Sequence, residues 1–233
     1  MGAIVMRFAL VAPFVLVLAC SSAPRQDFSA QDDGGTDAGD DASAAIGAEA
    51  GSGVSPTGYP AGPYGSAVGF TLNDFSAQGY RLSTQQTDST QLSWSPIDVL
   101  EYHTNPACKC LLVTVGATWC GECMAEQPML VMAHAQDPSF CVMGILQADI
   151  GGNGTQENAT KADVDAWTQM YKQNFFVVQG TDETMQKLVV GHGAGSVPLP
   201  FSLIVKPDTM KIVGEIDGVN LDAHGYAMSL CQP

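Results

Sequence analysis

The sequence predicts an α/β fold with a mixed central sheet flanked by helices. Segments with the composition of buried strands alternate with segments of helical periodicity within residues 66–233, and a strand hairpin and a last helix close the chain. Strands joined by helical crossovers run parallel, whereas a hairpin adds an antiparallel edge. The expected element order is therefore β-α-β-α-β-α-β-β-α.

The upstream part of this region has the weakest patterns. Val68–Phe75 alternates between apolar and polar residues and is expected to be a strand or an extended segment. The polar stretch Gln78–Trp94 predicts no element. Ser95 and Pro96 have the residue types of an N-cap and a first helical position, which predicts a short helix to about Tyr102.

The middle of the chain carries the clearest signals. Leu111–Val115 is a continuous apolar run, as expected of a strand buried on both faces, and Phe140–Gln147 is a second. Between them a helix is predicted from near Cys120 to about Ala135. The remaining predicted elements are a helix at Lys161–Gln173, a strand at Phe175–Val178, a helix at Glu183–Val190, a hairpin of Phe201–Val205 with Lys211–Ile216, and a helix at Leu221–Leu230.

The first 19 residues predict a targeting segment rather than part of the fold. Arg7 precedes the apolar run Phe8–Leu18, which is shorter than the ~20 residues that a membrane-spanning helix needs but suits a signal peptide. The ending Val17–Cys20 resembles a bacterial lipoprotein box, which implies lipidation of Cys20 after cleavage. By the same resemblance, Ser21 favours retention at the outer rather than the inner membrane. The alternative is an ordinary signal peptide cut near Ala19 or Ala23.

Residues 20–65 predict a disordered tether, because Ala, Gly, Ser and Asp dominate and little can be buried. A lipid followed by a flexible spacer would hold a domain away from a membrane surface. Acidic residues outnumber basic ones 24 to 9 in the whole chain, for a net charge of −15. This balance argues against nucleic acid as a partner, because phosphates need clustered Lys and Arg.

The segment Thr118–Cys123 is the strongest chemical signal. Cys120 and Cys123 follow a predicted buried strand and open a predicted helix. At a helix start, first-turn N–H groups and the helix dipole favour a thiolate, the nucleophilic form of cysteine. Cys120 is therefore expected to attack a disulfide, and the more buried Cys123 to resolve the mixed disulfide. Trp119 is expected to shield the sulfurs.

Ala117–Pro128, with the pattern W-C-x-x-C-x-x-E-x-P, resembles the TlpA/ResA-like thiol–disulfide oxidoreductases of the thioredoxin superfamily. The resemblance covers roughly Val68–Leu230 and implies a thioredoxin-like fold with an N-terminal extension and an inserted helix. It implies that Glu126 is an active-site carboxylate that handles protons and that Pro128 kinks the helix. Gly121 and Glu122 depart from the family, whose members usually have proline as the second residue between the two cysteines. A carboxylate at that position should raise the pKa of Cys120 and favour the reduction of partner disulfides.

The family also places a cis-proline beside the disulfide. Pro198 and Pro200 are the two candidates, and aligning Pro200–Pro207 with the family's strand and turn favours Pro200. A cis bond between Leu199 and Pro200 would present a backbone edge to a substrate peptide. The alternative is a loop with two trans prolines.

The remaining cysteines leave alternatives open. Cys108 and Cys110 precede one strand and Cys141 opens the next, so Cys141 could pair with either if these strands are parallel neighbours. Otherwise these three cysteines and Cys231 are buried or free thiols. A zinc or copper site is disfavoured because the two cysteine pairs should lie at opposite ends of one strand. The four histidines are expected at the surface or at helix ends, with His192 the best placed to line the site.

These observations predict an exported, membrane-tethered thiol–disulfide oxidoreductase that needs no diffusible cofactor and no metal. Its partners would be protein thiols and disulfides of the cell envelope. Two alternatives from other classes are a copper-delivery or other binding module on the same fold and a peroxiredoxin-like peroxidase. The latter uses a single peroxidatic cysteine in a Thr and Pro arrangement that residues 119–123 do not reproduce.

Overall fold

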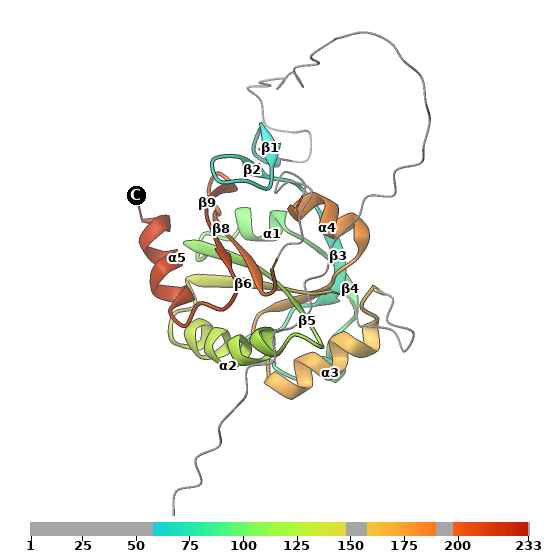
Figure 1. Ribbon diagram of the computed structural model, residues 1–233. Coiled ribbons are helices and arrows are strands. Elements are labelled where there is room, and N and C mark those ends of the chain that lie inside the picture. Colours follow the sequence, from blue (N-terminus) through green and yellow to red (C-terminus); the bar gives the residue numbers. More distant parts are fainter. Residues whose placement is uncertain (1–57, 148–157, 190–197, 233) are drawn as a thin grey trace, which may run out of the picture.

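A computed structural model describes residues 58–147, 158–189 and 198–232 (Figure 1). The strands are β1 (Tyr64–Gly65), β2 (Thr71–Leu72), β3 (Ser76–Tyr80), β4 (Ser95–Asp98), β5 (Cys110–Ala117), β6 (Phe140–Gln147), β7 (Phe176–Gln179), β8 (Phe201–Lys206) and β9 (Lys211–Asp217). The helices are α1 (Leu100–His103), α2 (Gly121–Gln136), α3 (Lys161–Tyr171), α4 (Asp182–Val189) and α5 (Ala223–Cys231), with a 3-10 turn at Ser89–Gln91.

The strands form one mixed sheet in the order β1-β2-β9-β8-β5-β6-β7-β3-β4. The central strands β5, β6 and β7 are parallel, and the β8–β9 hairpin runs antiparallel to β5. This arrangement confirms the predicted α/β class with a mixed central sheet flanked by helices. Strands β5 and β6 are buried along their whole length, as their continuous apolar sequences predicted.

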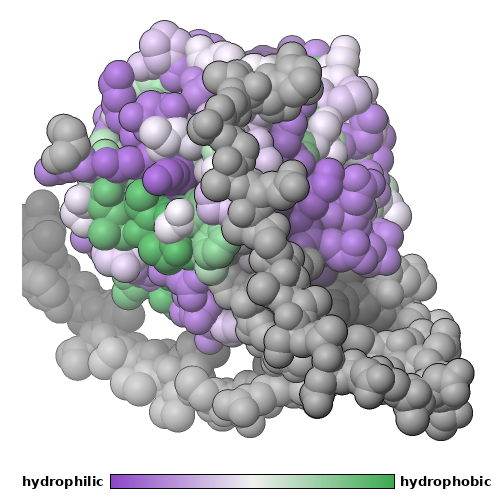
Figure 2. Space-filling view, turned by 90° about the horizontal axis from the view of Figure 1, so that it is seen from above, coloured by the Kyte–Doolittle hydropathy of each residue, from purple (hydrophilic) through white to green (hydrophobic). Residues whose placement is uncertain are grey.

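Helices cover both faces of the sheet (Figure 1). One apolar layer includes side chains of α1 and α4, among them Tyr102, Met185 and Leu188. The other includes side chains of α2, α3 and α5, among them Leu130, Trp167 and Ala227, together with Cys120 and Cys123. On the face seen in Figure 2, hydrophilic side chains predominate among the described residues and strongly apolar ones gather in one area. The Cys120–Cys123 pair belongs to the second of these two layers, which includes side chains of α2, α3 and α5.

The predicted helix at Ser95 is wrong, because Ser95–Asp98 is the edge strand β4, paired with β3. Ile97, a residue of this strand, is fully buried. Arg81 donates hydrogen bonds to Ser95 Oγ and to the Pro96 carbonyl. An edge strand tolerates Pro96 because one side of it needs no ladder hydrogen bonds. The helix begins only at Leu100, whose N–H donates to the Asp98 carboxylate over 2.8 Å.

The hairpin is not the edge of the sheet either, because β2 pairs with β9 and β1 pairs with β2. Within Val68–Phe75 only Thr71–Leu72 is a strand. The packed structure includes residues ahead of 66, since Tyr59 is 1% exposed and donates a hydrogen bond to the Leu72 carbonyl. In the described parts of the chain, no helix has the length and apolarity needed to cross a membrane.

Candidate active site

Cys120 and Cys123 lie where β5 ends and α2 begins, as the sequence predicted. They form a disulfide with a Cα–Cα distance of 5.2 Å. Cys120 is the N-cap of α2, and its Sγ accepts a hydrogen bond from the Cys123 N–H over 3.0 Å. Cys120 is 7% exposed and Cys123 is fully buried, so an approaching disulfide reaches Cys120 first.

Cys123 packs directly against the backbone of β5. A Cβ atom placed on Gly116 would lie 3.3 Å from Cys123 Cβ and 3.6 Å from its Sγ. The first of these distances is closer than most Cβ contacts, so Gly116 permits the approach of α2 to the sheet.

The Leu199–Pro200 peptide bond is cis, as predicted for Pro200 rather than Pro198. Pro200 is buried, whereas Pro198 is exposed. The antiparallel register pairs Val115 with Phe201, which places Pro200 beside the end of β5 that leads to Cys120. The Pro200 carbonyl accepts a hydrogen bond from the Gly218 N–H over 2.8 Å. Half-buried Trp119 and Leu199 pack against the same apolar layer as Cys120.

Glu126 lies one turn beyond Cys123 on α2 and is only 1% exposed. Burial raises the pKa of Glu126 from 4.5 to about 7, and the hydroxyl of Thr114 acts in the opposite direction. Thr114 Oγ1 lies 3.5 Å from Glu126 Oε2. Among the described residues, Glu126 Oε1 has no hydrogen-bond partner. A buried carboxyl with a pKa near neutrality suits proton exchange with a nearby dithiol.

Two buried glutamines, which the sequence analysis did not single out, continue this polar cluster. Gln127 Nε2 donates to the Cys123 carbonyl over 3.2 Å, and Gln173 Nε2 donates to Gln127 Oε1 over 2.6 Å. Both residues are at most 4% exposed. Gln127 follows Glu126 in the motif, but nothing in the sequence places Gln173 beside it, because Gln173 comes from the segment after α3.

The other four cysteines of the described residues form two disulfides at the opposite end of β5. Cys108 pairs with Cys141, one of the two pairings expected for Cys141, and Cys110 pairs with Cys231. The alternative of free thiols is therefore wrong. The Cys110–Cys231 bond was not expected; it joins β5 to the last residue of α5. Within residues 58–147, 158–189 and 198–232, no group of three metal-binding side chains is found.

Three histidines have structural partners. His134 Nδ1 lies 2.7 Å from the Phe140 carbonyl, His103 Nδ1 lies 2.7 Å from the Pro207 carbonyl, and His224 Nε2 lies 3.1 Å from Asp137. His192, Cys20 and the predicted signal peptide lie outside the described residues.

No protein-family model matches this chain, and no curated protein sequence matches it. It is similar to the solved thioredoxin domain of a thiol–disulfide oxidoreductase from Bacteroides vulgatus, at 14% identity and a TM-score of 0.49, over 70% of this chain and 98% of that one. A thiol:disulfide interchange protein of the thioredoxin family from Chlorobium tepidum is 16% identical, with a TM-score of 0.48 over 68% of this chain and 97% of that one. An exposed lipoprotein thioredoxin from Streptococcus pneumoniae is 20% identical, with a TM-score of 0.44 over 67% of this chain and 98% of that one.

Proposed function

We propose that this protein is an exported thiol–disulfide oxidoreductase that acts on protein partners. The observation that carries the proposal is the unequal pair at the start of α2: Cys120 caps the helix near the surface, and Cys123 is buried behind it. A thiolate at Cys120 receives the Cys123 N–H and the positive end of the helix dipole, both of which stabilise negative charge.

The reaction begins with the Cys120 thiolate attacking one sulfur of a partner disulfide. A new S–S bond joins Cys120 to the partner, and the other partner sulfur leaves as a thiolate that takes up a proton. Cys123 then loses its proton and attacks Cys120 Sγ, which releases the second partner sulfur. Overall the Cys120–Cys123 dithiol loses two electrons and two protons, and the partner disulfide gains them. The reverse reaction would introduce a disulfide into a partner.

Glu126 is the proposed proton acceptor for Cys123. It lies three residues further along the same helix, on the same face, in the interior of the protein. With a pKa of about 7, its carboxyl can take a proton from the thiol and release it near neutral pH. Trp119 and Pro200, at the border of the same site, are the proposed contacts of the partner chain.

Trapping of mixed disulfides tests this function. A Cys123→Ser protein should attack once and remain attached to its partner, which mass spectrometry can then identify. Cys120→Ser is the matched control and should trap nothing. Purified wild-type protein should reduce the insulin disulfides in the presence of a thiol reductant. Wild-type protein that neither reduces insulin nor exchanges with any partner would contradict the proposal.

We also propose that Cys20 carries a lipid and that the segment from there to residue 57, ahead of the packed residues, tethers the domain to a membrane, the outer membrane being favoured by Ser21. The support is the lipoprotein-like sequence Val17–Cys20 and the polar composition of the segment that follows. Cys20→Ser should abolish incorporation of labelled fatty acid and release the protein from the membrane fraction. Failure of the wild-type chain to incorporate fatty acid would refute the lipid anchor without affecting the proposed chemistry.

A further inference from the structure

Glu122 lies between the Cys120–Cys123 disulfide and the loop that follows β9. It is the second residue of α2, directly before Cys123, and its side chain is exposed. A Cβ atom placed on Gly218 would lie 3.9 Å from Glu122 Oε2. Gly218 in turn donates a main-chain hydrogen bond to the Pro200 carbonyl over 2.8 Å. The Glu122 carboxylate therefore lies where the cysteine motif meets the loop beside Pro200, the proposed contact of the partner chain.

The loop leaves this carboxylate uncovered. Gly218 has a φ of +78°, in the left-handed region that glycine adopts without steric cost. It has no side chain that could lie over Glu122. Asp217, the residue before Gly218, is exposed and adds a second carboxylate at this end of β9. A partner chain that approaches this border of the site therefore meets negative charge.

No basic side chain of the described segments forms an ion pair with Glu122. Most of these basic side chains have partners elsewhere: Arg81 with Glu101, Lys161 with Asp165, Lys187 with Glu183, Lys109 with the Pro106 carbonyl and Lys206 with the Gln232 carbonyl. Lys172 is the C-cap of α3, and Lys211 begins β9 at the opposite end of the strand from Asp217. Within these segments, the charge of Glu122 is thus left for a partner to meet.

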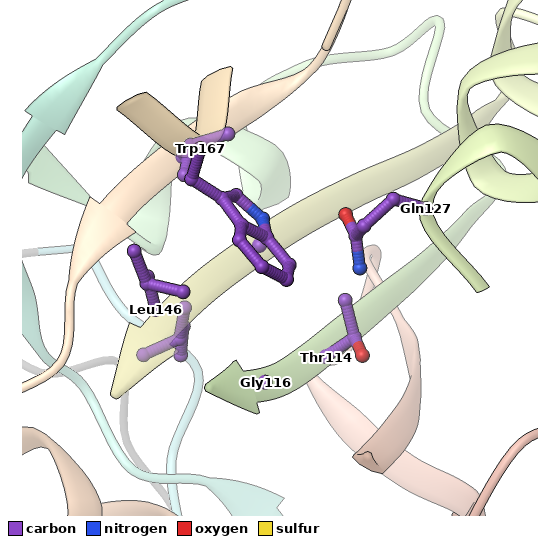
Figure 3. Close-up of a pocket in the computed structure, with 8 residues that line it drawn as sticks. Thr114, Gly116, Gln127, Leu146 and Trp167 are labelled. Carbon is purple, nitrogen blue, oxygen red and sulfur yellow. The ribbon is translucent and has the colours of Figure 1, made fainter. Parts of the chain in front are cut away.

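The cavity next to Gly116 is too small to select a partner. It lies between the sheet and helices α2 and α3 and has a volume of about 10 Å³. Figure 3 shows Thr114, Gln127, Leu146 and Trp167 around it, and no partner side chain would fit in this space. Selection between partners therefore depends on the exposed border of the site, where Glu122 lies.

We propose that Glu122 is a specificity-determining residue that favours partner disulfides flanked by lysine or arginine. The inference rests on the thiol–disulfide oxidoreductase function proposed above and names the class of partner for that site. In the mixed disulfide the attacked partner sulfur is bonded to Cys120, so the residues that flank this sulfur are held close to Glu122. A basic flanking residue is attracted by the carboxylate, and an acidic one is repelled.

The expected size of the effect follows from Coulomb's law with screening by salt. Two unit charges about 8 Å apart in water change a rate constant roughly 2-fold at about 10 mM salt. The change has opposite signs for a cation and an anion, so the ratio of their rate constants changes about 4-fold. At about 0.5 M salt the Debye length is only about 4 Å, and the same ratio should change by less than about 1.5-fold.

The test uses reduced protein and two symmetrical disulfides, so that attack on either sulfur is equivalent. Cystamine has an ammonium group on each half, and dithiodipropionate has a carboxylate on each half. In both reactions the Cys120–Cys123 dithiol becomes a disulfide, and the small disulfide takes up two electrons and two protons to become two thiols. Acid quenching, alkylation and mass spectrometry of the protein give the rate constants. The rate constant for cystamine divided by that for dithiodipropionate is the charge selectivity.

Glu122→Gln should lower the charge selectivity about 4-fold at low salt and by less than about 1.5-fold at high salt. Loss of the carboxylate also changes the thiolate fraction of Cys120, but this change affects both disulfides equally and cancels in the ratio. Glu122→Lys should lower the selectivity further. Asp208→Asn is the matched control, because it removes the same charge from the exposed turn between β8 and β9, at the other end of these strands. It should leave the selectivity unchanged.

Amide spectra of all variants establish that the fold is retained. A Glu122→Gln protein with the selectivity of the wild type would overturn the inference, as would an equal loss of selectivity in Asp208→Asn. Failure of the proposed function gives a different result, since wild-type protein would then react with neither disulfide faster than a free cysteine does. A wild type that reacts with both disulfides at the rates of Glu122→Gln keeps the proposed function and loses only the role of Glu122.

Discussion

The main-chain N–H of Cys123 points at the sulfur of Cys120, with a donor–acceptor distance of 3.0 Å. An ordinary N-cap uses a serine, threonine or aspartate oxygen for this hydrogen bond, and here a cysteine sulfur takes that position. The positive end of the dipole of α2 lies at the same point. A negative charge on Cys120 after reduction is therefore stabilised by groups that the fold has already placed.

This relationship predicts which cysteine reacts first. In reduced protein, a limiting amount of alkylating reagent should label Cys120 before Cys123, at pH values below the ~8.5 of an ordinary thiol, because only Cys120 combines thiolate stabilisation with access. Peptide mapping by mass spectrometry gives the order of labelling. Faster labelling of Cys123 would reverse the roles assigned to the two cysteines.

The raised pKa of Glu126 predicts that the free energy of unfolding depends on pH. Below pH 4.5 the carboxyl is neutral in both the folded and the unfolded chain, so its burial has no electrostatic cost. Between pH 4.5 and about 7 the unfolded chain releases the proton and the folded protein retains it, so the free energy of unfolding falls as pH rises. The full loss is about 3 kcal/mol above pH 7. Urea unfolding of oxidised protein at pH 5 and pH 8 measures most of this loss, about 2.5 kcal/mol, because the unfolded carboxyl is already partly ionised at pH 5.

Glu126→Gln is the control for this pH dependence, since the amide is neutral throughout. The variant should be more stable than the wild type at pH 8 and similar to it at pH 5. It should also change the pH–rate profile of disulfide exchange, because the resolving step loses its proton acceptor. Equal pH dependence of unfolding in the two proteins would show that the carboxyl is not held neutral by the fold, and an unchanged rate profile would remove Glu126 from the mechanism.

Removing either of the two disulfides at the far end of β5 is expected to lower the stability of the protein without abolishing its activity. Cys108–Cys141 closes a chain separation of 33 residues and Cys110–Cys231 one of 121. Chain-entropy estimates give roughly 4 and 5 kcal/mol for the two closures. Replacing both cysteines of either pair by Ala should lower the unfolding free energy, more for Cys110–Cys231, and leave insulin reduction by the folded protein intact. Loss of activity in folded double variants would give these bonds a redox role.

The centre of the molecule was predictable because local sequence and tertiary environment agree there. Continuous apolar runs identify β5 and β6, and the cysteine spacing locates the start of α2. The cis bond before Pro200 came from the family resemblance and the strand alignment, not from composition. The place of Glu126 in the site came from the same resemblance.

The edges were not predictable, because contacts between distant segments decide their structure. Ser95 and Pro96 have the residue types of a helix start, but pairing with β3 and the hydrogen bonds from Arg81 hold them in a strand. Similarly, Cys231 meets Cys110 only because α5 packs on β5, and Gln173 reaches Gln127 only because α3 packs beside α2. Sequence spacing carries no information on any of these encounters.

The contact between Gly116 and Cys123 gives the last prediction. A methyl group at Gly116 would lie 3.3 Å from Cys123 Cβ, and both atoms belong to regular elements that shift little. Gly116→Ala should therefore lower the unfolding free energy by about 1–3 kcal/mol through overpacking. By displacing Cys123 from its position behind Cys120, it should also slow the resolving step and increase the yield of trapped mixed disulfide.

Gly121→Ala is the matched control, one residue beyond Cys120 at the first position of α2. A methyl group there would meet no atom within 4 Å. It should stabilise the protein slightly, by about 0.4–1 kcal/mol, because alanine has less backbone freedom to lose on folding than glycine. Urea unfolding of both oxidised variants, with stopped-flow measurement of the resolving step, compares them. A Gly116→Ala protein as stable and as fast as Gly121→Ala would mean that the packing of α2 on β5 does not hold Cys123 in place.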